Sequence, residues 1–154
     1  MLNTNKQAAS TLIEVLIAVS IIALVLTAVG SMISMSIKLA DSNEKQQLAL
    51  QKAEEALEFF RKERSINSWY TFSTSLADEA IYCVSDLPES VASMSAQLGV
   101  CADDDVLEAA RYKFKRQAVI DFDGLNSVKV SIGLNWQEGT KSKSLSLEQS
   151  FENY

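Results

Sequence analysis

A run of apolar residues from Val15 to Ile37 contains no Asp, Glu, Lys or Arg. Hydroxyl side chains interrupt the run at five positions, which are Ser20, Thr27, Ser31, Ser34 and Ser36. As an α-helix rising about 1.5 Å per residue, the run is long enough to cross the roughly 30 Å hydrocarbon core of a bilayer. We therefore expect a single membrane-spanning helix, which limits the folds that remain open to the rest of the chain.

One charged residue, Glu14, stands at the start of this run. No other charged residue lies between Lys6 and Lys38. A carboxylate in a lipid-facing helix costs on the order of 3 kcal/mol at the bilayer centre, so such a residue normally has a partner and a function. The position of Glu14 marks it as a candidate functional residue.

Three interpretations of the N-terminal segment are open. A secretory signal peptide would end at a small-residue cleavage site, for which Ala28-Val29-Gly30 is the candidate. The continuation of the apolar run to Ile37 and the early Glu14 argue against it. An ordinary single-span anchor, carrying an extracytoplasmic binding domain that does not polymerise, explains the length but gives Glu14 no role. The third interpretation rests on a family resemblance.

The stretch Ser10-Thr11-Leu12-Ile13-Glu14-Val15-Leu16-Ile17-Ala18 resembles the N-terminal signature of type IV pilins and their pseudopilin relatives. In that family a short positively charged leader is cut just before the apolar helix, and a glutamate stands at the fifth mature position. Carried over, the leader is residues 1–9 with Lys6 as its charge, and the cut falls between Ala9 and Ser10. The family usually has Gly and Phe where this chain has Ala9 and Ser10.

The resemblance implies a structural subunit, more of the minor pilin or pseudopilin kind than a major pilin. A prepilin peptidase would cut and N-methylate the chain, which would wait in membrane lipid as a single-pass protein of the cytoplasmic membrane with its head outside. An inner-membrane assembly platform would then extract it into a pilus or secretion filament with other pilin subunits. Inside the bundled helices, Glu14 would pair the amine of Ser10 of a neighbouring subunit and fix the axial register.

The helix is predicted to continue beyond the membrane. Residues 41–64 are rich in Ala, Leu, Glu, Gln, Lys and Arg and contain no Gly or Pro. At helical spacing, one face collects an apolar stripe of Leu50, Ala53, Leu57 and Phe60. This stripe is the natural cover for an apolar sheet face.

Three strands are predicted near the C-terminus from alternating apolar residues, with turns at Asp123-Gly124 and Glu138-Gly139. Between helix and strands we expect a partly irregular connection with one short helix near residues 91–98. The fold class is α+β, a long N-terminal helix packed on a C-terminal antiparallel sheet, as the pilin resemblance also implies. The expected organisation is a leader (1–9), a transmembrane and assembly helix (10–37), its amphipathic continuation (38–66) and a globular head (67–154). The strand residues are Ala118, Ile120 and Phe122; Val128, Val130, Ile132, Leu134 and Trp136; and Leu145, Leu147 and Phe151.

The only cysteines, Cys83 and Cys101, lie in the part expected to be exported. An even count there predicts a disulfide, which would stabilise the head by roughly 3 kcal/mol in the chain-entropy model. Two free buried thiols are the alternative.

Composition favours a structural role over catalysis. The chain carries a formal charge of −6 and no His, and it shows no phosphate-binding loop or nucleophile motif. We expect no enzyme activity, cofactor or metal. The acidic runs Asp103-Asp104-Asp105 and Asp121 with Asp123 match no calcium-loop template. They are interpreted as solvated acidic turns or as a helix N-terminus near Val106. The basic residues are interpreted as scattered, so no nucleic-acid partner is expected.

Overall fold

The computed structural model describes residues 4–153, with side chains from residue 12 to residue 153. The chain divides into two compact units, Met1–Asn43 and Glu44–Tyr154. One helix, α1 (Thr4–Ile66), supplies the N-terminal unit and the first element of the C-terminal unit. By length and composition α1 holds a candidate membrane span, whose most apolar window has a mean hydropathy of 2.8.

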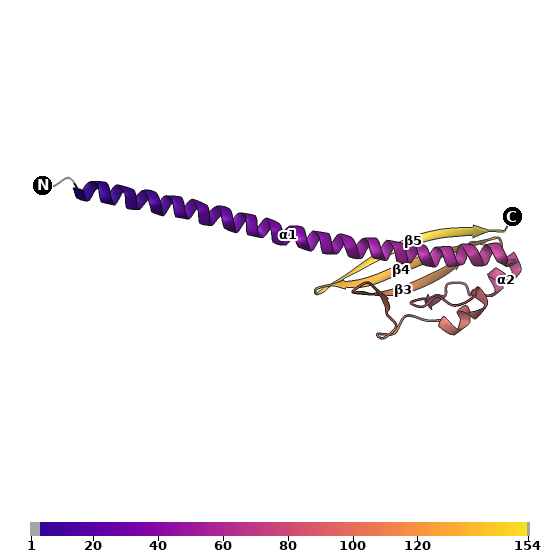
Figure 1. Ribbon diagram of the computed structural model, residues 1–154. Coiled ribbons are helices and arrows are strands. Elements are labelled where there is room, and N and C mark those ends of the chain that lie inside the picture. Colours follow the sequence, from indigo (N-terminus) through magenta and orange to yellow (C-terminus); the bar gives the residue numbers. More distant parts are fainter. Residues whose placement is uncertain (1–3, 154) are drawn as a thin grey trace. The chain divides into compact units, whose positions relative to one another are not determined.

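The C-terminal unit is an antiparallel sheet covered on one face by the last turns of α1 (Figure 1). The strand order is β1-β3-β4-β5, with β1 at Ile81–Cys83, and β2 (Leu107–Ala109) pairs separately with β3. The three long strands are β3 (Tyr112–Phe122), β4 (Ser127–Glu138) and β5 (Lys141–Glu152). The fold class predicted from the sequence, a long helix with a C-terminal antiparallel sheet, is therefore confirmed.

Two glycines allow the turns between the long strands. Gly124 lies between β3 and β4 with φ of +74°, and Gly139 lies between β4 and β5 with φ of +62°. Backbone of this hand is accessible to glycine without the steric cost that a Cβ brings. The two turns thus lie where the sequence predicted them, at opposite ends of the sheet.

The sheet has two more strands than the three that were predicted. These are β1 (Ile81–Cys83) and β2 (Leu107–Ala109), which pair antiparallel with β3. Each has only three residues, too few for a two-residue alternation to stand out from the surrounding irregular chain. The prediction of three strands was wrong because it required that alternation.

The connection also contains helices. The 3-10 helix η1 (Val91–Gln97) lies where a short helix was expected. The helix α2 (Trp69–Thr74) was missed, since its aromatic and hydroxyl residues have modest helix propensity. Ser68 caps α2 by accepting a hydrogen bond from the backbone N–H of Thr71, and Phe72 is fully buried. Packing in the core therefore outweighs weak local preference.

The buried face of α1 is displaced around the helix from the predicted stripe and is richer in alanine. Ala53, Leu57 and Phe60 are buried as expected, but Leu50 is 39% exposed. At about 100° per residue, Leu50 falls at the edge of the face centred on Ala49, Ala53, Ala56 and Phe60. Small side chains let the helix backbone approach the sheet. The sheet residues of this core include Ala118, Ile120, Val128, Val130, Ile132, Leu134 and Trp136.

Candidate functional site

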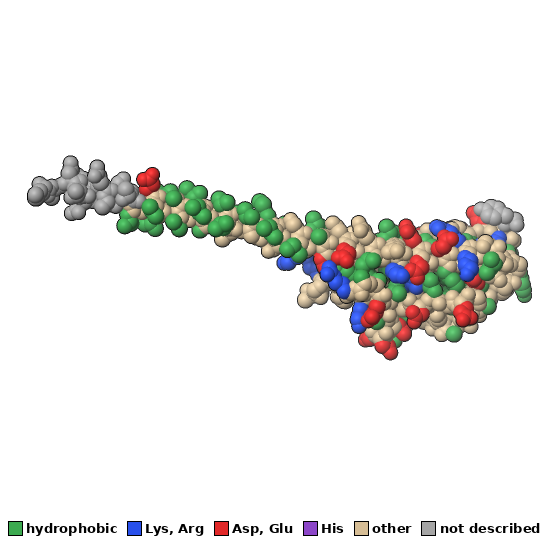
Figure 2. All heavy atoms as spheres, viewed as in Figure 1, with side chains coloured by type: hydrophobic (Ala, Val, Ile, Leu, Met, Phe, Trp, Pro, Cys, Tyr) green, Lys and Arg blue, Asp and Glu red, His purple; other side chains and the backbone are tan. Residues whose placement is uncertain are grey.

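The apolar part of α1 presents its side chains to the outside on every face. Large apolar residues from Leu12 to Leu39 are between 47% and 73% exposed. Figure 2 shows this part of the chain as a nearly continuous apolar surface. Exposed apolar area on this scale is rare in soluble monomers and marks contact with lipid or protein. The chain does not itself bury this surface within its described residues.

The polar groups of the same segment are satisfied within the helix. The five hydroxyls donate to backbone carbonyls three or four residues earlier, for example Ser20 to Leu16 at 2.7 Å and Thr27 to Leu24 at 2.8 Å. Ser31, Ser34 and Ser36 do the same. Transfer of a helix into an apolar environment costs little free energy when its hydroxyl groups donate hydrogen bonds to its own backbone. These residues are therefore compatible with lipid.

Glu14 is the exception in this segment. It is exposed on α1, and no ion pair of Glu14 occurs within the described part of the chain. The residues of the expected cut, Ala9 and Ser10, belong to α1, but their side chains lie outside the described side chains, as does that of Lys6. Residues 1–3 of the expected leader lie outside the description altogether. The assembly roles expected of Ser10 and Glu14 thus stay predictions.

The head contains the predicted disulfide. Cys83 and Cys101 are joined with their Cα atoms 4.8 Å apart. The bond ties the end of β1 to the loop that precedes β2, and so closes the segment that contains η1. The hydroxyl of Ser85 lies 3.6 Å from the Cys101 sulfur and donates to the carbonyl of Asp105 at 2.9 Å.

A buried arginine, which the sequence analysis did not single out, joins α1, the sheet and the loop after β1. Arg116 is 1% exposed. Its guanidinium donates to the carbonyls of Lys52, Val84 and Ser85 at 2.8, 2.7 and 3.3 Å. Burial lowers the pKa of Arg116, and the charges of Glu55 and Asp86 oppose that shift. The side chain therefore joins α1, through the carbonyl of Lys52, to the two residues that follow β1, Val84 and Ser85.

Glu63 is a second buried charge that was missed. It is 2% exposed near the end of α1, and its carboxylate accepts the backbone N–H of Val91 at 2.7 Å. That contact fixes the start of η1 against α1. From the sequence, Arg116 and Glu63 are interpreted as solvated charged residues of a strand and a helix. The one sequence signal of their burial is that each lies on the same face of its strand or helix as buried apolar neighbours.

The acidic runs are engaged in local structure. Asp105 accepts the N–H of Ala102 at 2.9 Å, and Asp103 pairs with Lys115 at 2.6 Å. The hydrogen bond and the charge of Lys115 hold the pKa of Asp103 below its usual value. Asp121 pairs with Lys129 at 3.5 Å. In residues whose side chains are described, no group of three or more acidic, His or Cys side chains is arranged to hold a metal ion.

Comparison with known proteins bears on the N-terminal segment alone. The prokaryotic N-terminal methylation motif matches residues 4–30, which include the expected cut site and Glu14. No curated protein and no solved structure matches the chain. The resemblance drawn from residues 10–18 is thereby confirmed, and it indicates a structural protein rather than an enzyme. Residues 4–30 of this chain carry the N-terminal signal of type IV pilins and prepilins.

Proposed function

We propose that the protein is a subunit of a type IV pilus or of a related secretion filament. The observation that carries the proposal is an apolar helix, exposed on all sides, that bears the methylation motif and a single carboxylate at its start. Lipid covers this apolar surface before assembly, and the corresponding helices of neighbouring subunits cover it in the filament. In this account a prepilin peptidase cuts between Ala9 and Ser10, and an inner-membrane assembly platform moves the subunit from the membrane into the filament.

Glu14 supplies register in the bundle of helices. Cleavage creates a positive amine on Ser10, and a neighbouring subunit presents that amine to Glu14. Each charge alone is costly in an apolar bundle, whereas the pair is strongly coupled at low dielectric. A subunit displaced along the axis loses the pair, so the correct stagger is selected even where the pair adds little net stability.

We assign the subunit to the minor pilins or pseudopilins rather than to the major pilins. Support comes from Ala9 and Ser10, which replace the Gly and Phe usual at the cut, and from the small head built on residues 67–154. Within the head, Cys83 and Cys101 form a disulfide, and the buried Arg116 donates hydrogen bonds to backbone carbonyls of the head.

Cleavage after Ala9 distinguishes this proposal most clearly from the alternative, a membrane-anchored domain that is not cut and does not polymerise. Intact-mass analysis of protein from the native host should show a chain that begins at Ser10, with the mass of one added methyl group. Ala9→Gly should preserve or improve cleavage, while Ala9→Leu should block it, because the peptidases of this family require a small residue there. A mature chain that begins at Ser31, or one that retains Ala9, would contradict the proposal.

A further inference from the structure

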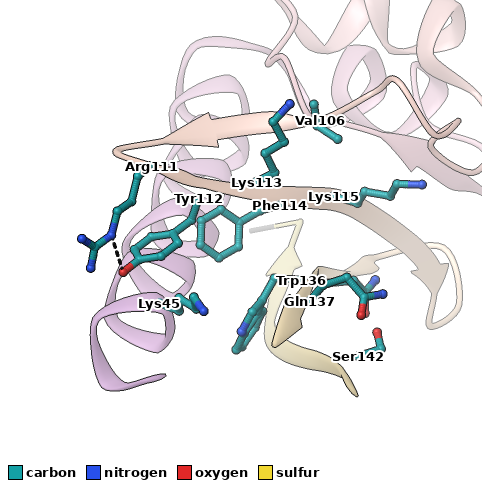
Figure 3. A pocket seen from close by; sticks show the side chains of 11 residues that line it. Lys45, Val106, Arg111, Tyr112, Lys113, Phe114, Lys115, Trp136, Gln137 and Ser142 are labelled. Atoms are coloured by element: carbon teal, nitrogen blue, oxygen red, sulfur yellow. Dashed lines mark hydrogen bonds between the residues drawn. The ribbon is translucent and has the colours of Figure 1, made fainter. Parts of the chain in front are cut away.

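The sheet opens into a fork at one end. Strands β3 and β4 pair from Phe122 opposite Val128 up to Lys115 opposite Asn135, and not beyond. Past that point the first residues of β3 pair with β2, whereas the last residues of β4 pair with β5. A cavity of about 510 Å³, here called the fork cavity, lies where the two pairs of strands separate (Figure 3).

The fork cavity combines cations with aromatic rings. Its lining includes Lys45, Arg111, Lys113 and Lys115, together with Tyr112, Phe114 and Trp136, but no carboxylate among the described residues. Four of the fourteen Lys and Arg residues of the chain therefore line one cavity. The interpretation of the basic residues as scattered was wrong for these four. The fold brings Lys45 of α1 and the basic residues at positions 111, 113 and 115 together with aromatic residues of β3 and β4.

Three of the four cations of the fork cavity are paired with carboxylates that lie outside it. Arg111 bonds to Glu44 at 3.0 Å, Lys113 to Glu108 at 3.2 Å and Lys115 to Asp103 at 2.6 Å. The carboxylate side chains are 48%, 68% and 108% exposed in these pairs. Exposed ion pairs are weak and salt-sensitive, so an external anion can replace a carboxylate at small cost.

More positive charge surrounds the opening. The hairpin between β4 and β5 places Lys141 opposite Glu138 and Lys143 opposite Trp136. Both lysines are exposed. With the four cavity residues they make six of the fourteen Lys and Arg residues of the chain, gathered at one end of the sheet.

Lys45, which lines the fork cavity, lies close in sequence to the end of the apolar run. The apolar run ends at Ile37, and Lys45 follows Lys38 by seven residues. Even a fully extended chain would place their Cα atoms at most about 25 Å apart. Trp and Tyr favour the interface between lipid and water, and Lys and Arg are attracted to anionic lipids at a membrane surface.

We propose that the fork cavity binds the anionic phosphodiester headgroups of the membrane in which the unassembled subunit waits. The cations displace their exposed carboxylates toward solvent and contact the lipid phosphates, while Trp136 and Tyr112 lie at the level of the headgroups. The head is thereby held down on the membrane until assembly withdraws the subunit. The inference rests on the membrane-inserted state of the proposed function and not on filament formation.

Fluorescence of the full-length protein in bilayers tests this. Trp69→Phe leaves Trp136 as the only tryptophan, and headgroup-spin-labelled lipid at a fixed fraction quenches indoles at the surface. Trp136 should be quenched more strongly in phosphatidylglycerol bilayers than in phosphatidylcholine bilayers, and added salt should remove the difference. Combining Arg111→Glu with Lys113→Glu should abolish it, since each unit of charge changes surface affinity roughly fivefold.

Two controls lie at the other end of the sheet. Lys129→Glu reverses a half-exposed cation that pairs with Asp121, and it should leave Trp136 quenching unchanged. Trp136→Phe leaves Trp69, which bonds to the Leu125 carbonyl in the turn between β3 and β4 and should show no lipid dependence.

Equal Trp136 quenching in the two lipids would overturn the inference, as would a loss with Lys129→Glu equal to that of the double variant. If Trp136 fluorescence changes with an oligodeoxynucleotide but not with phosphatidylglycerol, the ligand of the fork cavity is nucleic acid and the inference about lipid is overturned. Flotation with the vesicles reports insertion separately. Protein that fails to float contradicts the proposed function as well, whereas insertion without lipid dependence overturns this inference alone.

Discussion

The two units of the chain solve the problem of apolar surface in opposite ways. In the C-terminal unit, α1 and the sheet bury Phe60, Ile132 and their neighbours completely. In the N-terminal unit, side chains of the same kind are more than half exposed, such as Ile22 at 58%. The head is therefore explained by its own sequence, while the apolar helix becomes intelligible only through the lipid or protein that surrounds it.

The same contrast holds for charge. Arg116 is buried and satisfied by three carbonyls of its own chain. Glu14 is exposed in an apolar segment and has no ion pair in the described part of the chain. One charge organises a fold, and we infer that the other awaits a partner from a second subunit.

The largest expected effect comes from removing the buried charge of the head. Arg116→Ala removes the side-chain donor from the carbonyls of Lys52, Val84 and Ser85. It should lower the free energy of unfolding by about 3–5 kcal/mol, because each buried acceptor left unsatisfied costs about 1–3 kcal/mol. Arg61→Ala is the matched control, because Arg61 is half exposed and should matter by less than about 1 kcal/mol. Denaturant unfolding of the detergent-solubilised protein, followed by tryptophan fluorescence, measures both. Similar losses for the two variants would contradict the assignment of Arg116.

Two isoleucine substitutions, one in each unit, test whether the apolar surface of each unit contributes to the stability of the head. Ile132→Ala creates a cavity in the head and should cost about 2–5 kcal/mol in the free energy of unfolding. Ile22→Ala removes the same atoms from an exposed position and should leave that free energy unchanged. The same denaturant titration reads both variants. Destabilisation of the head by Ile22→Ala would show that the apolar helix is part of its core.

The disulfide should have the smallest effect of the three on the head. Replacing Cys83 and Cys101 together by Ser should lower the free energy of unfolding by roughly 3 kcal/mol in the chain-entropy model, and less if the opened loop keeps its contacts. In exported wild-type protein both cysteines should resist alkylation until a reductant is added. Ready labelling of both thiols in the folded protein would contradict the pairing.

The sequence predicted the long helix, the three long strands and their turns because each has many residues in a clear period. It did not predict β1, β2 or α2, since short elements depend on partners distant in the chain. Arg116, Glu63 and the fork cavity were missed for the same reason. Burial of Arg116 depends on carbonyls contributed by residues 52, 84 and 85, and the fork cavity depends on where the pairing of β3 with β4 stops. Leu50 was predicted to be buried, but the neighbouring Ala49 is buried in its place. The spacing of apolar residues does not distinguish these adjacent positions, because both residues are apolar.

The N-terminal motif is different again. Residues 10–18 predicted a family directly, because an isolated glutamate at the start of an apolar helix is a rare pattern with a specific chemistry. The structure of a single chain adds the exposure of that helix, and we infer that the partner of Glu14 belongs to another subunit.

The most direct test is therefore the fate of Glu14→Gln in the native host. Removing the charge relieves an insertion cost of a few kcal/mol, so the amount of membrane-bound subunit should equal or exceed that of wild type. Its amount in sheared surface filaments should fall steeply, because the neighbour's amine stays unpaired in the bundle at a cost of about 3–5 kcal/mol. Glu54→Gln, an exposed glutamate on the same helix, should enter filaments as wild type does. Equal incorporation of Glu14→Gln and wild type into filaments would contradict the account.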